Sequence, residues 1–172
     1  MILPMGGPPP CDNAGMPAAL SNQLRNRIDR ELPPLEAFTE EQAAAYPARG
    51  GWSPKEELGH LIDSAANNHT RFVIGAIGPE LRGPGYAQND WVRLHGYAEM
   101  PWQRIVAFWY AYNALLADLI ARIPEDRLTT VCHVEPYPPA TLRFLIEDYG
   151  VHLQHHVDHL LSRPFVTPYP PV

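Results

Sequence analysis

The histidines are the residues in this sequence whose type and spacing could support chemistry. The chain has eight of them, and half lie between residues 152 and 159. These four are His152, His155, His156 and His159. On a helix that turns about 100° per residue, His156 falls inside the apolar arc of its segment and His152 at its edge. His155 points farthest toward solvent. The pattern therefore favours His152 and His156 as an inward-facing pair.

Metal binding is the chemistry that this pair suggests. Residues four apart share one helix face, so His152 and His156 can offer two imidazoles to one cation. Imidazole suits zinc, nickel, iron and copper. Two ligands bind weakly, so a third group must come from another helix. The alternative is that these histidines form only a polar boundary on the rim of the helix. We expect His159 to lie outside the ligand set, where it could hydrogen-bond near the site or lie at a subunit interface.

His60 is the best candidate for the third ligand, although its neighbours allow two interpretations. It lies in the first turns of a helix, and its neighbours on the helical wheel are polar: Glu56, Ser64, Asn67 and Arg71. By wheel position alone, this stripe is a solvated face. The alternative is that the stripe lines a cleft facing the last helix. Spacing does not decide between them.

Three further residues of the same helix are candidates for supporting roles. Asp63 lies about one turn after His60 and could orient a ligand imidazole through a hydrogen bond. A surface or capping role is the commoner one for such a residue. Asn67 and Arg71 share the stripe of His60 and could bind an acidic group of a substrate. A surface salt bridge is the default expectation for Arg71.

Four long helices are predicted to position these residues. The 20 prolines cluster between proline-free windows, and proline breaks helix interiors. We expect helices at residues 18–32, 54–77, 102–123 and 141–162, a helical turn at 40–45 capped by Thr39, and an extended piece within 128–137. Pro33 and Pro34 should end or kink the first helix. Ser53, Pro54 and Glu56 give the second helix a capping box. The prediction is an all-α four-helix bundle with proline-rich connections.

Composition narrows the class of protein. The chain has 172 residues, 45% of them hydrophobic and 19% charged, with a net charge of −6. These values predict one globular domain at 16–163, a flexible tail at 1–15 and an extended tail at 164–172. The acidic balance argues against nucleic-acid binding. No apolar run is long enough to span a membrane, and no secretory signal is visible. Two cysteines do not make a disulfide scaffold. We expect a cytoplasmic protein.

Two motifs in this order resemble those of the DinB/YfiT-like superfamily of metal-dependent four-helix-bundle proteins. The first is Trp52-Ser53 followed by His60-Leu61-Ile62-Asp63-Ser64, and the second is His152-Leu153-Gln154-His155-His156. The resemblance covers about residues 18–162. It implies that His60, His152 and His156 are three metal ligands, with open positions for water. The implied metal is a divalent ion, zinc or nickel first, with iron or manganese as further options.

The resemblance also implies a range of functions. Some relatives are similar to thiol-dependent S-transferases and others to hydrolases. The expectation is therefore an enzyme whose metal activates a thiol or water for transfer to, or hydrolysis of, a small molecule. A low-molecular-weight thiol could be a second substrate, and a homodimer is expected. The alternative is a non-catalytic helical bundle that binds a small ligand or a protein partner.

Overall fold

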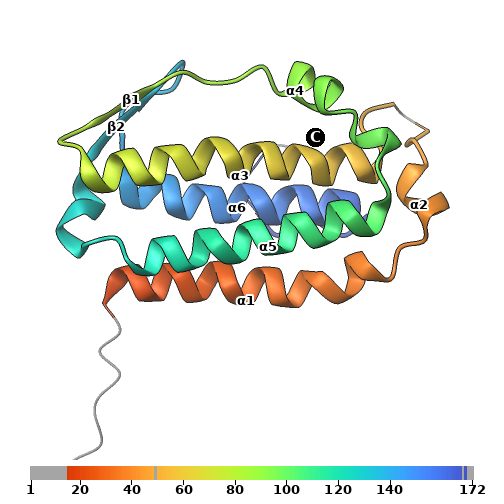
Figure 1. The fold of residues 1–172 in the computed structure, drawn as a ribbon, viewed down its shortest axis with the longest axis horizontal. Helices are drawn as coiled ribbons and strands as arrows, with labels where there is room; N and C mark the ends of the chain where they lie inside the picture. Colours follow the sequence, from red (N-terminus) through yellow and green to blue (C-terminus); the bar gives the residue numbers. More distant parts are fainter. Residues whose placement is uncertain (1–14, 49, 168, 170–172) are drawn as a thin grey trace, which may run out of the picture.

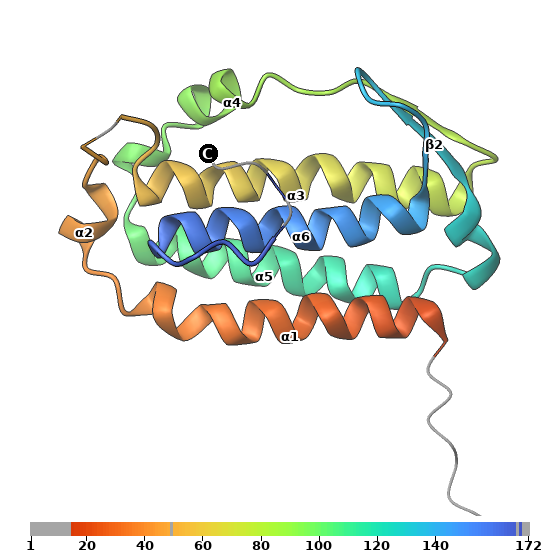
Figure 2. The same cartoon turned by 180° about the vertical axis from the view of Figure 1, so that it is seen from behind.

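Four long helices form the body of the protein, as the sequence predicts (Figure 1). The computed structural model describes residues 15–48, 50–167 and 169. The long helices are α1 (Met16–Glu36), α3 (Pro54–Ile77), α5 (Trp102–Ala121) and α6 (Leu142–Leu160). Helix α1 packs mainly on α5, and α3 packs on both α5 and α6. The view from behind shows the same side-by-side arrangement (Figure 2).

Shorter elements connect the long helices. They are α2 (Glu40–Ala44), β1 (Leu81–Gly83), α4 (Gln88–His95), β2 (Val131–Val134), β3 (Ala140–Thr141) and two 3-10 turns, η1 (Tyr97–Glu99) and η2 (Glu125–Thr129). The strands form a small sheet in the order β1-β2-β3. Strand β1 is parallel to β2, with Leu81 opposite Cys132, and β2 is antiparallel to β3. Helix α4 and the sheet lie on the α3 side of the bundle, away from α1 (Figures 1 and 2).

Local capping signals fix the start of α3. Ser53 is its N-cap: the Ser53 hydroxyl accepts from the Glu56 backbone N–H, and the Glu56 carboxylate accepts from the Ser53 N–H. Pro54 occupies the first helical position, where its missing N–H removes no helix hydrogen bond. The helix ends at Ile77, before Gly78. The predicted boundaries are confirmed, and they set which face of α3 carries His60. The predicted short helix with its Thr39 cap is also confirmed.

The first helix does not end at its two prolines. Helix α1 continues through Pro33 and Pro34 to Glu36, so a stop after residue 32 was wrong. Tertiary contacts hold the last turn: Leu35 is fully buried, and its carbonyl accepts a 2.8 Å hydrogen bond from Trp102 Nε1. These contacts outweigh the two helix hydrogen bonds that proline cannot make.

The remaining boundaries follow the predictions closely. Helix α5 ends two residues early, at Ala121, and α6 is slightly shorter than 141–162. Strand β2 confirms the extended piece within 128–137. Strands β1 and β3 and helix α4 were not predicted, because each is short and depends on tertiary partners.

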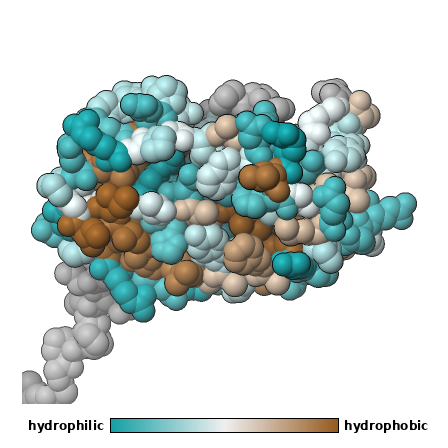
Figure 3. Space-filling view, turned by 45° about the horizontal axis from the view of Figure 1, so that its top comes forward, coloured by the Kyte–Doolittle hydropathy of each residue, from teal (hydrophilic) through white to brown (hydrophobic). Residues whose placement is uncertain are grey.

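Tails were predicted at both ends of the chain. Residues 1–14 lie outside the described residues, so the flexible tail at 1–15 is a prediction beyond them. Residues 164–167 have no helix or strand, and Phe165 stacks on α6 through His155. No helix among the described residues is long and apolar enough to cross a membrane. On the face shown in Figure 3, hydrophobic residues gather at the end of the bundle where the sheet lies. Ile77 and Val131 belong to this end, and both are exposed.

Candidate metal centre

Three imidazoles from two helices meet between α3 and α6. Each of His60, His152 and His156 offers one ring nitrogen that lies within 4.8 Å of the nitrogens of the other two. His60 Nε2 and His152 Nε2 are 3.4 Å apart. Two nitrogens bound to one tetrahedral zinc at about 2.0–2.1 Å would be separated by about 3.3 Å. The donor set and its spacing therefore fit a divalent ion that prefers imidazole.

The polar stripe of α3 faces the bundle interior at His60. His60 is only 1% exposed, so the solvated-face alternative was wrong. The stripe is covered because α6 packs against this face of α3, and the Trp52 ring lies 4.9 Å from the imidazole of His60. A wheel drawn for one helix cannot show that the polar face is the one that meets its neighbour.

Burial keeps two of these imidazoles neutral. It lowers the pKa of His60 to about 3, and the nearby imidazole of His156 adds to the effect. Burial also lowers the pKa of His152 well below the usual value for histidine. Neutral imidazole is the form that binds a metal. Near neutral pH, His60 and His152 therefore do not have to lose a proton before they can bind a cation.

Glu57 orients the third imidazole. Its Oε1 lies 2.5 Å from Nδ1 of His156, and the carboxylate is buried. This contact holds Nδ1 away from the cluster and leaves Nε2 for a metal, an arrangement common around metal-bound histidine. The role of Glu57 was not predicted from the sequence. The signal available was an acidic residue one turn before His60, on the same helix.

Asp63 does not orient a ligand imidazole, so that expectation was wrong. Its Oδ1 accepts from the Tyr97 hydroxyl at 2.7 Å and lies 2.9 Å from Nδ1 of His95. Its other oxygen, Oδ2, is buried without a partner among the described residues. Three residues beyond His60, the helix has turned this carboxylate toward α4 and η1. Asp63 therefore anchors the connection that passes over α3.

Helix α6 carries two other histidines. His159 lies where it was expected, and His155 does not. His159 lies outside the three-imidazole cluster, 3.3 Å from the Glu57 carboxylate. His155 was expected to point farthest outward, but it is 2% exposed. Phe165 stacks on it with ring centroids 4.4 Å apart, and Thr167 Oγ1 lies 2.9 Å from its Nδ1. The segment after α6 folds back over this face, which the wheel of one helix could not predict.

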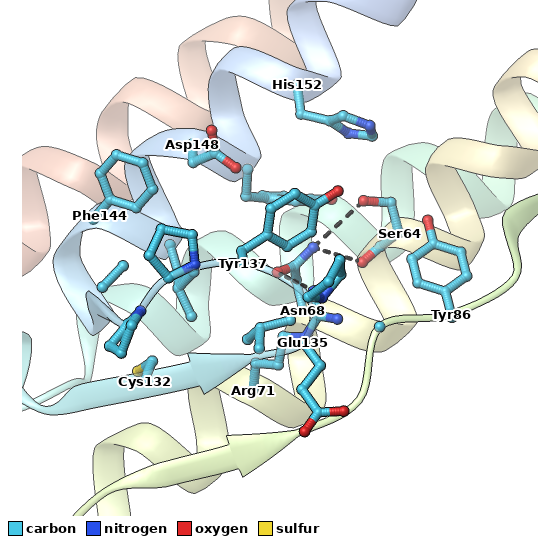
Figure 4. A pocket seen from close by; sticks show the side chains of 18 of the residues that line it. Ser64, Asn68, Arg71, Tyr86, Cys132, Glu135, Tyr137, Phe144, Asp148 and His152 are labelled. Atoms are coloured by element: carbon cyan, nitrogen blue, oxygen red, sulfur yellow. Dashed lines mark hydrogen bonds between the residues drawn. The ribbon is translucent and has the colours of Figure 1, made fainter.

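A cavity of about 850 Å³ opens beside the cluster. His152 forms part of its wall and so joins the cavity to the three imidazoles (Figure 4). Five aromatic side chains contribute to the lining: Tyr86, Tyr137, Phe144, Tyr149 and Tyr169. The volume is within the usual range for sites that bind small molecules.

Helix α3 contributes three polar residues to the wall of the cavity. Arg71 lines the cavity with Ser64 and Asn68. Asn67 does not line it and donates instead to the Asp63 carbonyl at 2.9 Å. Of the two residues expected to meet an acidic substrate group, only Arg71 faces the cavity, and Asn68 takes the place given to Asn67.

Comparisons with known proteins agree with this architecture. A protein of Oceanobacillus iheyensis named "Putative metal-dependent hydrolase OB0782" is 28% identical over 149 residues, which cover 82% of this chain and 84% of that protein. The structure of YfiT from Bacillus subtilis, described as a probable metal-dependent hydrolase with an unusual four-helix bundle topology, superposes with a TM-score of 0.75 at 18% identity. The match covers 91% of this chain and 90% of YfiT. The family model of the DinB superfamily matches residues 23–160. Since that match spans most of the chain, this protein belongs to the DinB superfamily.

Proposed function

We propose that the protein is a metal-dependent hydrolase of small molecules, in which His60, His152 and His156 hold the metal ion. One observation carries the proposal: three buried or partly buried imidazoles converge at the wall of a cavity large enough for a substrate. A polar boundary would not need imidazoles from two helices within 4.8 Å of one another. The names of the two relatives support hydrolysis as the reaction.

The chemistry of the donor set supports a catalytic metal. Three histidine ligands leave a coordination position open for water or substrate. A divalent ion held there by these imidazoles would supply Lewis-acid chemistry, which activates a water or a substrate carbonyl. The cluster contains only imidazoles, which favours zinc or nickel, with iron and manganese as further options.

The side chains around the cluster have roles of their own. Glu57 fixes the ring orientation of His156. Trp52 packs against the ring of His60 and limits the access of water. The aromatic lining holds the apolar part of a substrate against His152. Each of these groups binds, orients or shields.

No observation supports thiol transfer in the way that the histidine cluster and the names of the relatives support hydrolysis. The one described cysteine, Cys132, is buried, and burial raises the pKa of its thiol, so it is a poor nucleophile. A thiol co-substrate would have to come from solution. The homodimer and the cytoplasmic location expected from the sequence remain predictions.

The test is a metal-dependent hydrolysis assay with matched variants. Tag-free protein is stripped with a chelator, reloaded with Zn²⁺ or Ni²⁺, and screened against aryl esters, amides and lactones with and without an added thiol. We expect turnover by the wild type and by His133→Ala, whose imidazole lies outside the cluster, and none by His156→Ala. Equal turnover by His156→Ala and wild type would refute the proposal. Turnover only with the thiol present would replace hydrolysis by transfer.

A further inference from the structure

Arg71 is a cation in the cavity wall without an anionic partner. It projects from α3 and is partly buried. No carboxylate among the described residues forms an ion pair with it, and the ionisable groups that influence it are Tyr86 and Tyr137. A partly buried charge is costly unless an opposite charge compensates it. An anionic ligand would supply that compensation.

Most of the hydrogen-bonding capacity of Arg71 is unused. Nη2 donates to the Pro84 carbonyl at 3.1 Å, and Nη1 makes a long contact of 3.5 Å with Asn68 Oδ1. A guanidinium has five N–H donors in a planar fork, so the remaining donors have no acceptor in the described protein. Burial lowers the pKa of Arg71, which agrees with a cation that has lost water without gaining an anion. The planar fork matches the two oxygens of a carboxylate.

The acidic residues of the wall do not fill this role. Asp148 accepts a hydrogen bond from Tyr169. Glu135 is exposed, and its carboxylate points away from the cavity (Figure 4). The surface around Arg71 is instead aromatic, which favours an apolar body attached to the anionic group.

The helix that carries Arg71 also carries His60. The two residues are 11 positions apart on α3, which at ~1.5 Å per residue places their Cα atoms about 16 Å apart along the axis. Ser64 and Asn68 lie between them on the same face, and Asn68 Nδ2 donates to the Ser64 carbonyl at 3.0 Å. A ligand that touches both ends is therefore elongated, on the order of 10–16 Å long.

We propose that the cavity binds an elongated small molecule with a terminal carboxylate, which Arg71 holds through a paired hydrogen bond. The apolar body lies among the tyrosines, and the opposite end reaches His152 and the cluster. That the ligand reacts at the end near His152 rests on the proposed function. The carboxylate subsite itself does not, because it depends only on Arg71 and the cavity.

The test compares three probes that share a phenylalkyl body and end in an anionic, a neutral or a cationic group: 6-phenylhexanoate, 6-phenylhexanamide and 6-phenylhexylamine. Binding to the full chain is measured by calorimetry, with and without Zn²⁺. We expect the carboxylate to bind at least tenfold more tightly than the amide or the amine. Arg71→Gln should remove this preference by weakening carboxylate binding at least tenfold while leaving amide binding unchanged. Arg71→Lys should retain part of the preference, because it keeps the charge but loses the planar fork.

Arg93→Gln is the matched control, since Arg93 is an exposed residue of α4 that pairs with Asp90. It should bind all three probes like the wild type. Equal binding of carboxylate and amide, tightest binding of the amine, carboxylate binding that survives Arg71→Gln, or no binding of the carboxylate would each overturn the proposal. Circular dichroism and metal content of Arg71→Gln are measured to check that the fold and the metal centre are unchanged. If the subsite is confirmed while His156→Ala still hydrolyses substrates, the proposed function fails and the subsite stands.

Discussion

Glu57 Oε1 lies 2.5 Å from Nδ1 of His156, and this contact joins the first turn of α3 to the later turns of α6. Both groups are buried. The carboxylate fixes which nitrogen of His156 faces the cluster, so the geometry of the three imidazoles depends on a residue that is not itself one of them. Several consequences of this arrangement can be measured.

Replacing Glu57 by glutamine should weaken metal binding. The amide keeps the size of the side chain but removes the negative charge that orients His156. Changes of this kind typically cost 10–100-fold in metal affinity, and we expect a loss in that range. Zn²⁺ affinity is measured by competition with a chromophoric chelator. Glu41→Gln, an exposed residue of α2, is the control. Wild-type affinity in Glu57→Gln would show that the contact does not position the imidazole.

Metal should stabilise the folded protein. A ligand that binds only the native state at 100 times its Kd contributes about 2.7 kcal/mol. For a chain of this size this raises Tm by roughly 5–10 °C. Scanning calorimetry of stripped and Zn²⁺-loaded protein measures the shift. His152→Ala should show little shift, and a shift equal to that of the wild type would mean that the metal binds elsewhere.

Glu31 should make stability depend on acid pH. Burial alone would raise its pKa, but hydrogen bonds from Arg30, Arg163 and Gln154 outweigh this effect and hold its pKa below the usual value. A carboxylate with a lowered native pKa binds protons more readily in the unfolded state. Its contribution is therefore complete above about pH 4.5 and is lost as the pH falls through the native value.

The comparison of wild type with Glu31→Gln isolates this contribution. We expect the variant to lose about 1–3 kcal/mol at pH 7, the cost of weakening hydrogen bonds to charged groups. The difference should shrink as the pH falls below about 4.5. Urea unfolding at several pH values measures it. A difference that is constant down to pH 3, or that grows, contradicts the assignment.

Gly59 should resist substitution because a ring occupies the space of its side chain. A Cβ at this position would lie 2.2 Å from the Tyr97 ring. Asp63 holds that ring through the Tyr97 hydroxyl, so the ring cannot move freely. We expect Gly59→Ala to cost about 1–3 kcal/mol, as overpacking does. Gly83→Ala, where a Cβ would meet nothing within 4 Å, is the control. Equal stability of the two variants in urea unfolding would contradict this packing.

The parts of the fold encoded by local signals were predictable from sequence. Ser53, Pro54 and Glu56 act within one turn, and they gave the start of α3 correctly. The two prolines of α1 are also local signals, but Trp102 and the burial of Leu35 overrode them. Strands β1 and β3 are too short to leave a pattern.

In the candidate site too, features set by one helix were predictable from the sequence, and features that depend on two elements were not. The spacing of His152 and His156 is a property of one helix and was read correctly as an inward-facing pair. The burial of His60 depends on α6, and the burial of His155 depends on the segment that carries Phe165. The Glu57–His156 contact depends on two helices in register. No single-helix pattern contains these relationships, which is why Asp63 was given the role that Glu57 occupies.

The most direct test of the three-imidazole centre is the metal content of tag-free protein measured by inductively coupled plasma mass spectrometry beside His60→Ala. We expect about one equivalent of a divalent metal in the wild type and its loss in the variant, with α-helical content unchanged. Full stoichiometry in His60→Ala would remove His60 from the centre. A wild type that takes up no metal after reloading would contradict the metal centre as a whole.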